Sequence, residues 1–483
     1  KIMSDQQTKL SSREKVGYGL GDTASNIFFF GVNAWIFFYY TEICKIPPAT
    51  VGTLLLVPRL WDAISDPLMG TLSDRTRTKM GTYRPYLLWL AIPFGICGYL
   101  TFANPDFSLN GKIIYAYITY IALMTAYTAI NVPYSALMGV MTPSPDERTK
   151  LATYRFVGAF SGQLLISMTF LPLVMSLGGD DKGVGFPRAM ALLAVVATLM
   201  FLITFFTTKE RVKPPEIDKS PKPNEDEDYS GPFSASSDGR SSFGWDFGSL
   251  LNNRPWVVMV AAALLTLTAA AVRWTITPQH LKYFFGVGDE KYFLFLDKIS
   301  FVQTTGSLAF IAGVFLTGFF SKRFGKRNSL IGLTILNGLT ILSIYLIPQD
   351  GYTTLVIVNI IGSLIAGPTP ALVWAMYTDV ADYNEWKTGR RATGLAFSAA
   401  MFSQKLGISI GGALCGWVLG AVGFVPDKTP SEEVVNSFRW IASLLPGILA
   451  ILNGFVLLGY NLSDAKVERI AKDLAEGRGE GDE

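Results

Sequence analysis

The sequence contains few of the residues from which enzyme active sites and metal centres are built. Its 483 residues include one histidine and three cysteines, Cys44, Cys97 and Cys415. The cysteines lie in or beside separate apolar segments, which predicts neither a disulfide framework nor a metal cluster. No Gly-x-x-x-x-Gly-Lys-Ser/Thr loop for nucleotide phosphates occurs. The sequence therefore predicts a protein that is not an enzyme, with no catalytic residue and no cofactor.

Charge is also scarce. Charged residues make up 16% of the chain, against about 25% in an average soluble domain. Hydrophobic residues make up 50%, and the net charge is only +3. Aromatic residues, at 13%, suit cavity walls and the interfacial belts of membrane proteins. This composition excludes an ordinary soluble protein and indicates one that spans a membrane.

About twelve apolar segments are long enough to cross a hydrocarbon core of ~30 Å. Helices are expected, because isolated strands in lipid leave backbone groups unpaired. The predicted fold is an all-α membrane protein with twelve transmembrane helices in two six-helix bundles. The approximate spans are 16–42, 49–73, 84–104, 112–141, 152–177, 187–207, 255–285, 292–321, 328–347, 353–380, 392–424 and 433–461.

Basic residues set the expected orientation. They gather in the connections that follow even-numbered segments and are sparse in the opposite connections. The positive-inside rule then puts both termini in the cytoplasm. The basic residues concerned are Arg75, Arg77, Lys79 and Arg84; Arg148 and Lys150; Lys322, Arg323, Lys326 and Arg327; and Lys387, Arg390 and Arg391.

The chain divides at its longest polar stretch. The predicted domains are an N-terminal bundle over 1–208, a cytoplasmic central loop over 209–253, a C-terminal bundle over 254–462 and a cytoplasmic tail over 463–483. The loop is acidic and then Ser/Gly-rich, a composition that cannot bury a core. The tail is expected to form a short amphipathic helix.

A hexapeptide repeat supports two related halves. Gly70-Thr-Leu-Ser-Asp-Arg75 follows the second segment, and Gly318-Phe-Phe-Ser-Lys-Arg323 follows the eighth. Their equivalent placement favours parallel repeats of six helices. Two ordinary basic loops are the alternative explanation.

Two aspartates one helical turn apart, Asp62 and Asp66, lie within the apolar run 51–70. An ionised carboxylate at bilayer depth costs at least roughly 2.5–3.5 kcal/mol, so it needs a purpose. At spacing i, i+4 both point from one helix face, where Arg59 and Ser65 can join them. Such a pair suits a small hard cation or a proton. The alternative is an ion-pair network that only holds helices together.

Further polar side chains lie at membrane depth in other segments. Aromatics, amides and charges around one wet cavity suit a sugar, whose faces stack on rings and whose hydroxyls use donors and acceptors. Taken singly, each residue can instead serve helix–helix contacts, and Arg273 can snorkel. The candidates are Asp22; Tyr127, Asn131 and Ser135, which share one face; Arg155; Arg273 and Trp274; and Lys405.

From about residue 12 to residue 465, except for the central loop, the chain resembles a known family. It is similar to the glycoside–pentoside–hexuronide:cation symporters, the melibiose permease group of the major facilitator superfamily. The motifs that carry this resemblance are Gly17-Tyr-Gly-Leu-Gly-Asp-Thr-Ala-Ser25, Arg59-Leu-Trp-Asp-Ala-Ile-Ser-Asp-Pro-Leu-Met-Gly70 and Asp382-Tyr-Asn-Glu-Trp-Lys-Thr-Gly-Arg390.

The resemblance implies roles for individual residues. Asp62 and Asp66 match the aspartates of the family's Na⁺, Li⁺ or H⁺ site, with Ser65 and Thr128 beside them. Asp22 matches an aspartate that holds sugar hydroxyls. The basic residues that match those lining the sugar and cation sites are Arg155 and Lys405.

Two positions depart from melibiose permease. Asn131 stands where that protein has a second sugar-binding aspartate, and Ser135 where it has a tryptophan. The stretch 131–135 is more similar to the branch that moves β-xylosides and glucuronides. A carboxylate-bearing sugar is therefore a candidate substrate.

Together these features predict a secondary transporter of the bacterial cytoplasmic (inner) membrane, expected to be a monomer without a nucleic-acid partner. It would import a glycoside, pentoside or hexuronide with Na⁺ (or H⁺) by alternating access. A lysolipid or other amphiphile transporter on the same scaffold and a non-transporting sugar sensor are the alternatives. The charge networks expected to hold the outward-open state include Asp74, Arg75, Arg84, Arg323, Asp379 and Arg390.

Overall fold

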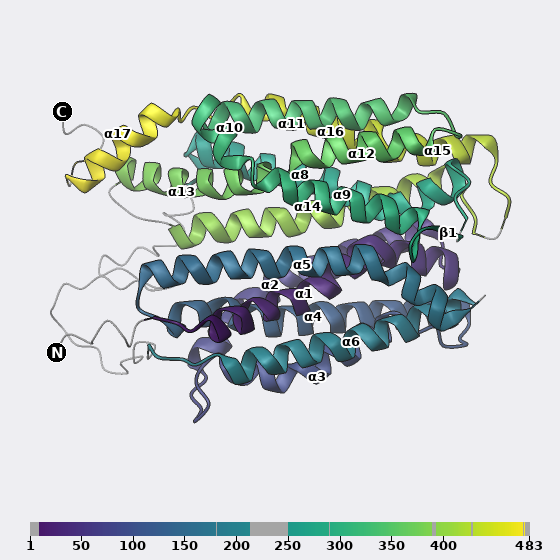
Figure 1. Cartoon of the computed structure of the whole chain (residues 1–483), viewed down its shortest axis with the longest axis horizontal. Helices are drawn as coiled ribbons and strands as arrows, with labels where there is room; N and C mark the ends of the chain where they lie inside the picture. The colour runs from purple at the N-terminus through teal and green to yellow at the C-terminus, as the bar shows by residue number, and fades with distance from the viewer. Residues whose placement is uncertain are drawn as a thin grey trace. The chain divides into compact units, whose positions relative to one another are not determined.

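Figure 1 presents the computed structural model of the chain. It describes residues 9–179, 181–212, 250–288, 290–388, 393–426, 428–476 and 478. Most of the predicted central loop and Arg390 therefore lie outside the described residues. Within them the regular secondary structure is helical, apart from one two-stranded hairpin and an isolated bridge between Thr78 and Gly81. Seven helices are long and apolar enough to cross a membrane, or up to eight if the bent pair α9–α10 is one span.

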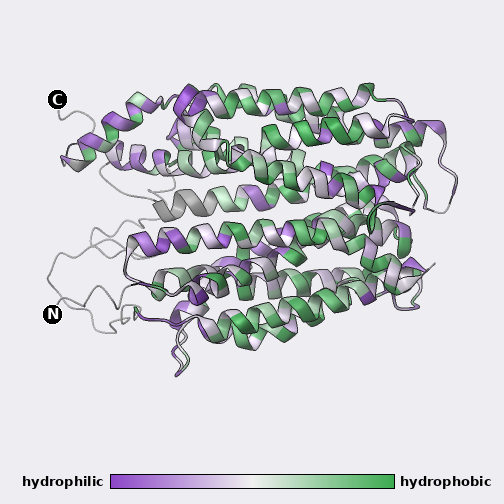
Figure 2. Ribbon diagram, in the orientation of Figure 1, coloured by the Kyte–Doolittle hydropathy of each residue, from purple (hydrophilic) through white to green (hydrophobic). Residues whose placement is uncertain are grey.

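The expected class, an all-α membrane protein, is confirmed by these helices. The number of twelve spans and the cytoplasmic position of the termini stay predictions. Figure 2 shows hydrophobic residues over most of the helical surface, with a hydrophilic stretch at the start of α5, where Asp146, Glu147 and Arg148 lie. This pattern agrees with helices whose middles face lipid and whose ends face water.

The described residues form two compact units. Unit 1 takes in the described residues within 1–216, 274–307 and 412–438, and unit 2 those within 217–273, 308–411 and 439–483. Four helices of the second half of the chain, α8, α9, α14 and α15, change unit along their length. The predicted division at the central loop describes halves of the sequence, whereas the units describe packing.

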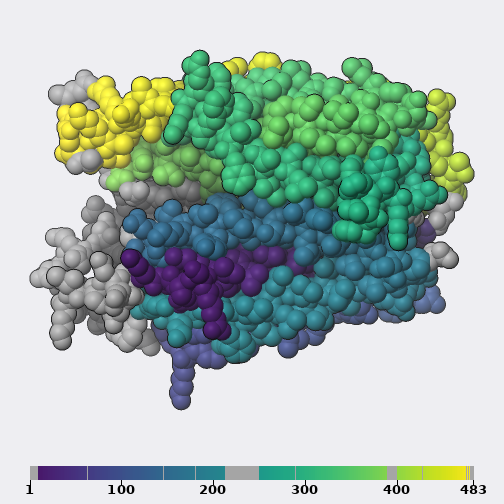
Figure 3. All heavy atoms as spheres, in the orientation of Figure 1, coloured from purple at the N-terminus to yellow at the C-terminus, as the bar shows by residue number. Residues whose placement is uncertain are grey.

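The first half of the chain supplies six long helices to unit 1. α1 lies along α5, as Figures 1 and 3 both show. Their close approach depends on small residues, because a Cβ on Gly158 would lie 2.1 Å from the carbonyl oxygen of Gly19. Prolines 58 and 67 do not end α2. The helices are α1 (Ser12–Phe38), α2 (Pro48–Arg75), α3 (Arg84–Thr101), α4 (Leu109–Met141), α5 (Pro145–Gly178) and α6 (Lys182–Thr207).

The helices begin at side chains that satisfy their first backbone N–H groups. Ser11 and Glu14 form a capping box at the start of α1. Ser108, Ser144 and Asp181 accept from the first turns of α4, α5 and α6. Because the first N–H groups of a helix have no intrahelical partner, such caps fix where each helix starts.

The second half of the chain departs from the predicted spans in three places. Segment 353–380 is interrupted at 367–368, between α12 and α13. Segment 292–321 begins as a hairpin, and its helices α9 and α10 are bent by 46°. Segment 433–461 breaks between α15 and α16 at Ser443. The elements are α8 (Arg254–Gln279), β1 (Lys291–Phe293), β2 (Leu296–Asp297), α9 (Lys298–Val314), α10 (Thr317–Phe324), α11 (Lys326–Ser343), a 3-10 turn η4 (Ile344–Leu346), α12 (Tyr352–Ala366), α13 (Thr369–Thr388), α14 (Thr393–Ala421), α15 (Glu432–Ala442), α16 (Leu444–Leu457) and α17 (Asp464–Ala475).

The predicted helix in the tail is present as α17. Ile470 is buried against unit 2. The indole N–H of Trp386 on α13 donates to the carboxylate of Asp473 at 3.2 Å. The apolar face of the helix therefore packs on the rest of unit 2, while Arg469 and Lys472 stay exposed.

The same local structure occurs at the ends of α1 and α8. Each ends in a π-helical turn, η2 (Tyr39–Ile43) and η3 (His280–Phe284). The backbone bonds Cys44 N–H to Tyr39 O and Ile46 N–H to Tyr40 O recur 241 residues later, between Phe285 and His280 and between Val287 and Leu281. Lys45 and Gly286, also 241 residues apart, both have φ of 61°. The first helices of the two halves therefore end in the same way.

The left-handed conformation at this repeat predicts a sharp difference between two glycines of one loop. Gly286→Ala should lower stability by about 1–2 kcal/mol, because a Cβ is strained at positive φ. Gly288→Ala is the matched control, since its Cβ would meet open space and its φ is ordinary. Thermal unfolding in detergent measures both. Equal melting temperatures for the two variants would contradict the assigned turn.

Candidate functional site

One face of α2 is polar and turned into unit 1. Arg59, Asp62 and Ser65 are buried, with Asp62 only 2% exposed, and Asp66 is half-buried. The opposite face carries the exposed side chains of Leu60, Trp61, Ile64 and Leu68. The predicted common face of the two aspartates is therefore present.

Side chains of α2 and α4 meet at the two aspartates. The hydroxyl of Thr128 donates to Oδ1 of Asp66 at 2.8 Å. Nη1 of Arg59 lies 3.4 Å from Oδ2 of Asp62, a loose ion pair. The buried hydroxyl of Ser65 has no hydrogen-bond partner among the described residues. The structure thus brings the four predicted cation-site residues, Asp62, Ser65, Asp66 and Thr128, into one region.

This region offers carboxylate and hydroxyl oxygens, the ligands that hard cations prefer. Within the described part of the chain, no group of three or more His, Cys, Asp or Glu side chains is placed to hold a metal ion. Two carboxylates beside an arginine suit a monovalent cation or a proton better than a divalent metal.

A second polar group joins α1, α4 and α5. Nε of Arg155 lies 3.3 Å from Oδ2 of Asp22, and Nη2 of Arg155 donates to the Ser135 hydroxyl at 3.1 Å. The guanidinium also lies 5.4 Å from the ring centre of Tyr134. Three predicted substrate-site residues, Asp22, Ser135 and Arg155, therefore contact one another.

Asn131, on α4, is held by a residue that the sequence analysis missed. The Ser25 hydroxyl lies 2.8 Å from Oδ1 of Asn131, and Nδ2 of Asn131 donates to Tyr127 O at 3.1 Å. The bond to Tyr127 O requires the amide nitrogen on that side, so Oδ1 must face Ser25 as an acceptor. The amide keeps one N–H and one oxygen lone pair for a ligand.

Two buried tyrosines brace α1 against α4. The Tyr134 hydroxyl donates to Tyr18 O at 2.6 Å, and the Tyr18 hydroxyl donates to Tyr134 O at 3.2 Å. Their rings stack at 4.7 Å. Gly21 makes room, because a Cβ there would lie 2.5 Å from the Tyr134 ring. The brace fixes the backbone beside Asp22 and Arg155.

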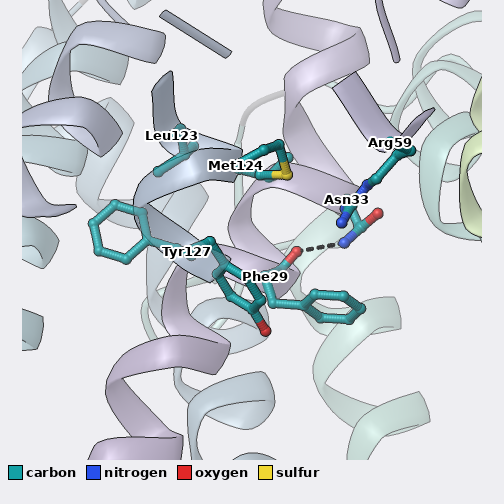
Figure 4. A pocket seen from close by; sticks show the side chains of 8 residues that line it. Phe29, Asn33, Arg59, Leu123, Met124 and Tyr127 are labelled. Carbon is teal, nitrogen blue, oxygen red and sulfur yellow. Dashed lines mark hydrogen bonds between the residues drawn. The ribbon is translucent and has the colours of Figure 1, made fainter. Parts of the chain in front are cut away.

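A small cavity opens between α1, α2 and α4, shown in Figure 4. Its empty volume, including its open mouth, is about 250 Å³. Asn33 and Arg59 approach each other on one wall, and Phe29 and Tyr127 lie on the other. Nδ2 of Asn33 donates to Phe29 O at 2.7 Å. Of these residues the sequence analysis singled out Tyr127 as a substrate residue and missed Asn33.

The remaining predicted substrate residues are divided between the two units. Trp274 belongs to unit 1, where its ring lies 6.5 Å from that of Phe29 and 5.9 Å from that of Phe30. Arg273 belongs to unit 2 and donates to Oδ1 of Asn359 at 3.0 Å. Lys405, half-buried on α14, also belongs to unit 2. A role for Arg273 and Lys405 in the substrate site stays a prediction.

The predicted network residues of unit 1 lie around the start of α3. The Tyr83 hydroxyl donates to Asp74 at 2.8 Å, and its burial beside that carboxylate raises the pKa of Tyr83. Arg84 donates to Phe205 O at 2.8 Å, and Arg75 is exposed. Glu210, which the sequence analysis missed, accepts the backbone N–H groups of Thr82, Tyr83 and Arg84 at 2.8–2.9 Å.

In unit 2 the predicted network is centred on Asp379, which forms an ion pair with Lys326. The backbone N–H of Lys326 donates to the carboxylate of Asp464, at the start of α17, at 3.1 Å. Arg323 is exposed, its guanidinium 5.7 Å from the ring of Phe324.

The class of the protein follows from its membrane-spanning helices together with the fold and family matches: it is a transporter of the major facilitator type. A crystal structure of a D-xylose–proton symporter matches with a TM-score of 0.64 and 14% identity, over 92% of this chain and 98% of that chain. The family model described as MFS/sugar transport protein matches residues 17–464. The chain belongs to this family, a family of transporters rather than enzymes.

Three relatives match the chain along nearly its whole length. Two are from Escherichia coli strain K12: the putative glycoside/cation symporter YagG, with 36% identity over 98% of this chain and 96% of its own, and the inner membrane symporter YicJ, with 35% over 97% and 96%. The isoprimeverose transporter of Lactiplantibacillus pentosus is 32% identical over 95% and 90%. The predicted kinship with the glycoside–pentoside–hexuronide group is confirmed, and the chain is a multi-pass inner-membrane transporter.

The tyrosine brace predicts unequal effects of removing its two hydroxyls. Tyr134→Phe should cost about 0.5–1.5 kcal/mol of stability, since it removes a buried hydrogen bond to a helical carbonyl. Tyr18→Phe should cost less, because its bond is longer. Thermal unfolding measures both, with Tyr117→Phe as the control, since that hydroxyl makes no hydrogen bond to any residue that the structure describes. If the two hydrogen bonds of the brace contribute nothing to stability, the three variants will have equal melting temperatures.

Proposed function

We propose that the protein imports a glycoside in symport with Na⁺, and that the Na⁺ binds between Asp62 and Asp66. The observation that carries this proposal is the division of the buried polar groups of unit 1 into two clusters. The first, at the α2–α4 contact, presents carboxylates and hydroxyls to an ion. The second, on α1, α4 and α5, presents a paired carboxylate, a guanidinium and an amide to a sugar.

The ion cluster works by charge. Two aspartates within one turn repel each other in a medium of low dielectric constant, and Arg59 compensates one of them loosely. A bound Na⁺ neutralises the remaining charge and takes the Ser65 and Thr128 hydroxyl oxygens as further ligands. A proton on either aspartate would serve the same purpose less selectively.

The two clusters share α4, and this suggests how they are coupled. Thr128, which bonds Asp66, is one turn from Asn131 and two turns from Ser135, which bonds Arg155. An ion that binds both Asp66 and Thr128 therefore acts on the helix that carries sugar ligands. Such coupling is reciprocal: the sugar must raise cation affinity by the factor by which the cation raises sugar affinity.

A neutral glycoside or pentoside is the first candidate substrate. In unit 1 the charges of Arg59, Arg155 and one Na⁺ balance those of Asp22, Asp62 and Asp66, so the cluster favours no net charge on the sugar. The relatives named as glycoside and isoprimeverose transporters support this choice. A hexuronide is the second candidate, supported by the neutral amide of Asn131 and by Arg273 and Lys405.

The ion assignment predicts the behaviour of one conservative variant. Asp66→Asn should abolish Na⁺-stimulated uptake in proteoliposomes and leave the protein folded, because it removes an ion ligand but keeps an acceptor for Thr128. Asp106→Asn, in an exposed loop, is the control and should transport normally. Intact Na⁺-stimulated uptake by Asp66→Asn would refute the assignment.

The substrate assignment predicts the outcome of a panel of matched neutral and acidic glycosides, tested with Na⁺ and pH gradients imposed separately. Uptake of the neutral sugar should exceed that of the uronide by at least roughly tenfold, equivalent to about 1.4 kcal/mol. Arg273→Ala should leave this ratio of neutral-sugar uptake to uronide uptake unchanged. If uronides are the better substrates and Arg273→Ala removes that preference, the second candidate is correct.

The alternative classes are separated by two controls in the same proteoliposomes. Sugar counterflow excludes a sensor that binds without transport. Competition by lysolipids, if stronger than competition by sugars, would instead favour an amphiphile carrier.

A further inference from the structure

A buried carboxylate that neither cluster uses lies in the π-helical turn after α1. Glu42 is 5% exposed. Its carboxylate accepts from the Lys282 ammonium at 2.6 Å and from the Tyr283 hydroxyl at 2.7 and 2.8 Å. Lys282 and Tyr283 belong to η3, the equivalent turn after α8. All three residues are part of unit 1.

Aromatic side chains surround this group. The Tyr283 ring stacks on Phe438 at 5.0 Å and meets Phe424 edge-on at 5.4 Å. The Lys282 ammonium lies 5.5 Å from the ring centre of Phe38. Aromatic rings from the end of α1 and from the region of α15 therefore lie beside the ion pair. They shield its carboxylate side from water, which strengthens the attraction.

A second contact between the two halves of the chain lies at the N-terminal end of α2. A Cβ on Gly416 would lie 2.4 Å from Pro48 O and 2.6 Å from the Cα of Gly52. The indole N–H of Trp417 donates to the Thr53 hydroxyl at 3.1 Å. α2 and the last part of α14 are thus in backbone contact.

A third contact joins α5 to the first part of α9. The Ser167 and Ser307 hydroxyls lie 3.1 Å apart, and Nε2 of Gln163 lies 3.5 Å from Ser307. Ser307 is also the last residue of its stretch in unit 1; from Leu308 on, α9 belongs to unit 2. In each of α8, α9 and α14, only the part near these contacts belongs to unit 1 with the first half of the chain. These parts are 274–279, 298–307 and 412–421.

We propose that Glu42, Lys282 and Tyr283 form an ionic latch that closes the outer end of the transport path. This end lies opposite the basic connections, so the positive-inside rule places it outside the cytoplasm. The inference rests on the proposed transport by alternating access, in which closure at this end must be broken before sugar and cation can enter. π-helical turns are frequent at functional sites, and here they supply both sides of the latch.

The two charges of the latch differ in exposure, and this makes the proposal testable. The Lys282 side chain is 38% exposed and the Glu42 side chain 5%. Removing Glu42 leaves an ammonium that water can still reach. Removing Lys282 leaves a buried, uncompensated carboxylate, which is much less stable. Loss of Lys282 should therefore open the latch further than loss of Glu42.

The experiment measures opening directly. Ser167→Cys, in a chain whose three native cysteines are replaced by serine, reports on the α5–α9 contact through its initial rate of reaction with a membrane-impermeant maleimide added outside right-side-out vesicles. Without sugar, Lys282→Met should raise this rate roughly tenfold, equivalent to about 1.4 kcal/mol. Glu42→Gln should raise it roughly threefold. Lys182→Ala, which alters another lysine near Phe38, is the control and should leave it unchanged.

The double variant distinguishes a latch from general loosening. Glu42→Gln with Lys282→Met leaves no buried charge, so its rate should fall below that of Lys282→Met alone. Additive effects, or unchanged rates in both single variants, would overturn the proposal. If Lys282→Met does not fold, Tyr283→Phe and Glu42→Gln decide, since both keep the shape of the site. Labelling needs no substrate, so a failed sugar-uptake assay with the expected labelling pattern would refute the proposed function and not the latch.

Discussion

The cost of holding a carboxylate away from water decides where this protein places its polar groups. In the described part of the chain, three buried or half-buried acids on or beside the membrane helices have a partner from another element. Asp22 has Arg155, Asp66 has Thr128, and Glu42 has Lys282 and Tyr283. Because a carboxylate stripped of its partner is costly, each of these contacts joins helices strongly when made and changes the protein when broken. The same property makes such groups suitable for a transport cycle.

α4 is the element on which the two clusters of unit 1 converge. Its residues 127–135 contact the ion cluster, the cavity, the amide of Asn131 and the tyrosine brace. Pro133 stands within this stretch, where it removes one backbone hydrogen bond from the helix. This helix lacks one backbone hydrogen bond, is fixed to α1 at Tyr134 and contacts the ion cluster through Thr128. A small movement of the helix on ion binding would therefore reach the residues that face the sugar.

The sequence predicted the features that depend on helix periodicity and on the scarcity of charge in membranes. The common face of Asp62 and Asp66 follows from their spacing, whereas the pairing of Asp22 with Arg155 depends on which helices become neighbours. Ser25, Asn33 and Tyr18 were missed because their roles depend on which helices become neighbours, and spacing along one helix does not reveal that. Ser25 had a weak signal, since it lies three residues after Asp22 on the same face.

Glu210 and the hairpin at 291–297 show a second limit of prediction. Glu210 looked like one more charge in a mixed cytoplasmic connection, yet it accepts three N–H groups at the start of a helix far away in the sequence. Such capping depends on tertiary structure. The hairpin is apolar enough to resemble the start of a span, but Leu294 at its tip has φ of 57°, a conformation that no helix continues.

The 241-residue repeat has a consequence for how the two halves diverged. Under that offset the counterpart of Glu42 is Tyr283, so the hydrogen bond between them joins a residue to its own copy. This is the mark of an isologous contact, in which one surface faces its duplicate across a two-fold axis. A carboxylate only accepts hydrogen bonds, so two identical glutamates at this point would repel each other. A chain with two identical halves could not make this bond, and closure here required one copy to become a donor while the other remained an acceptor.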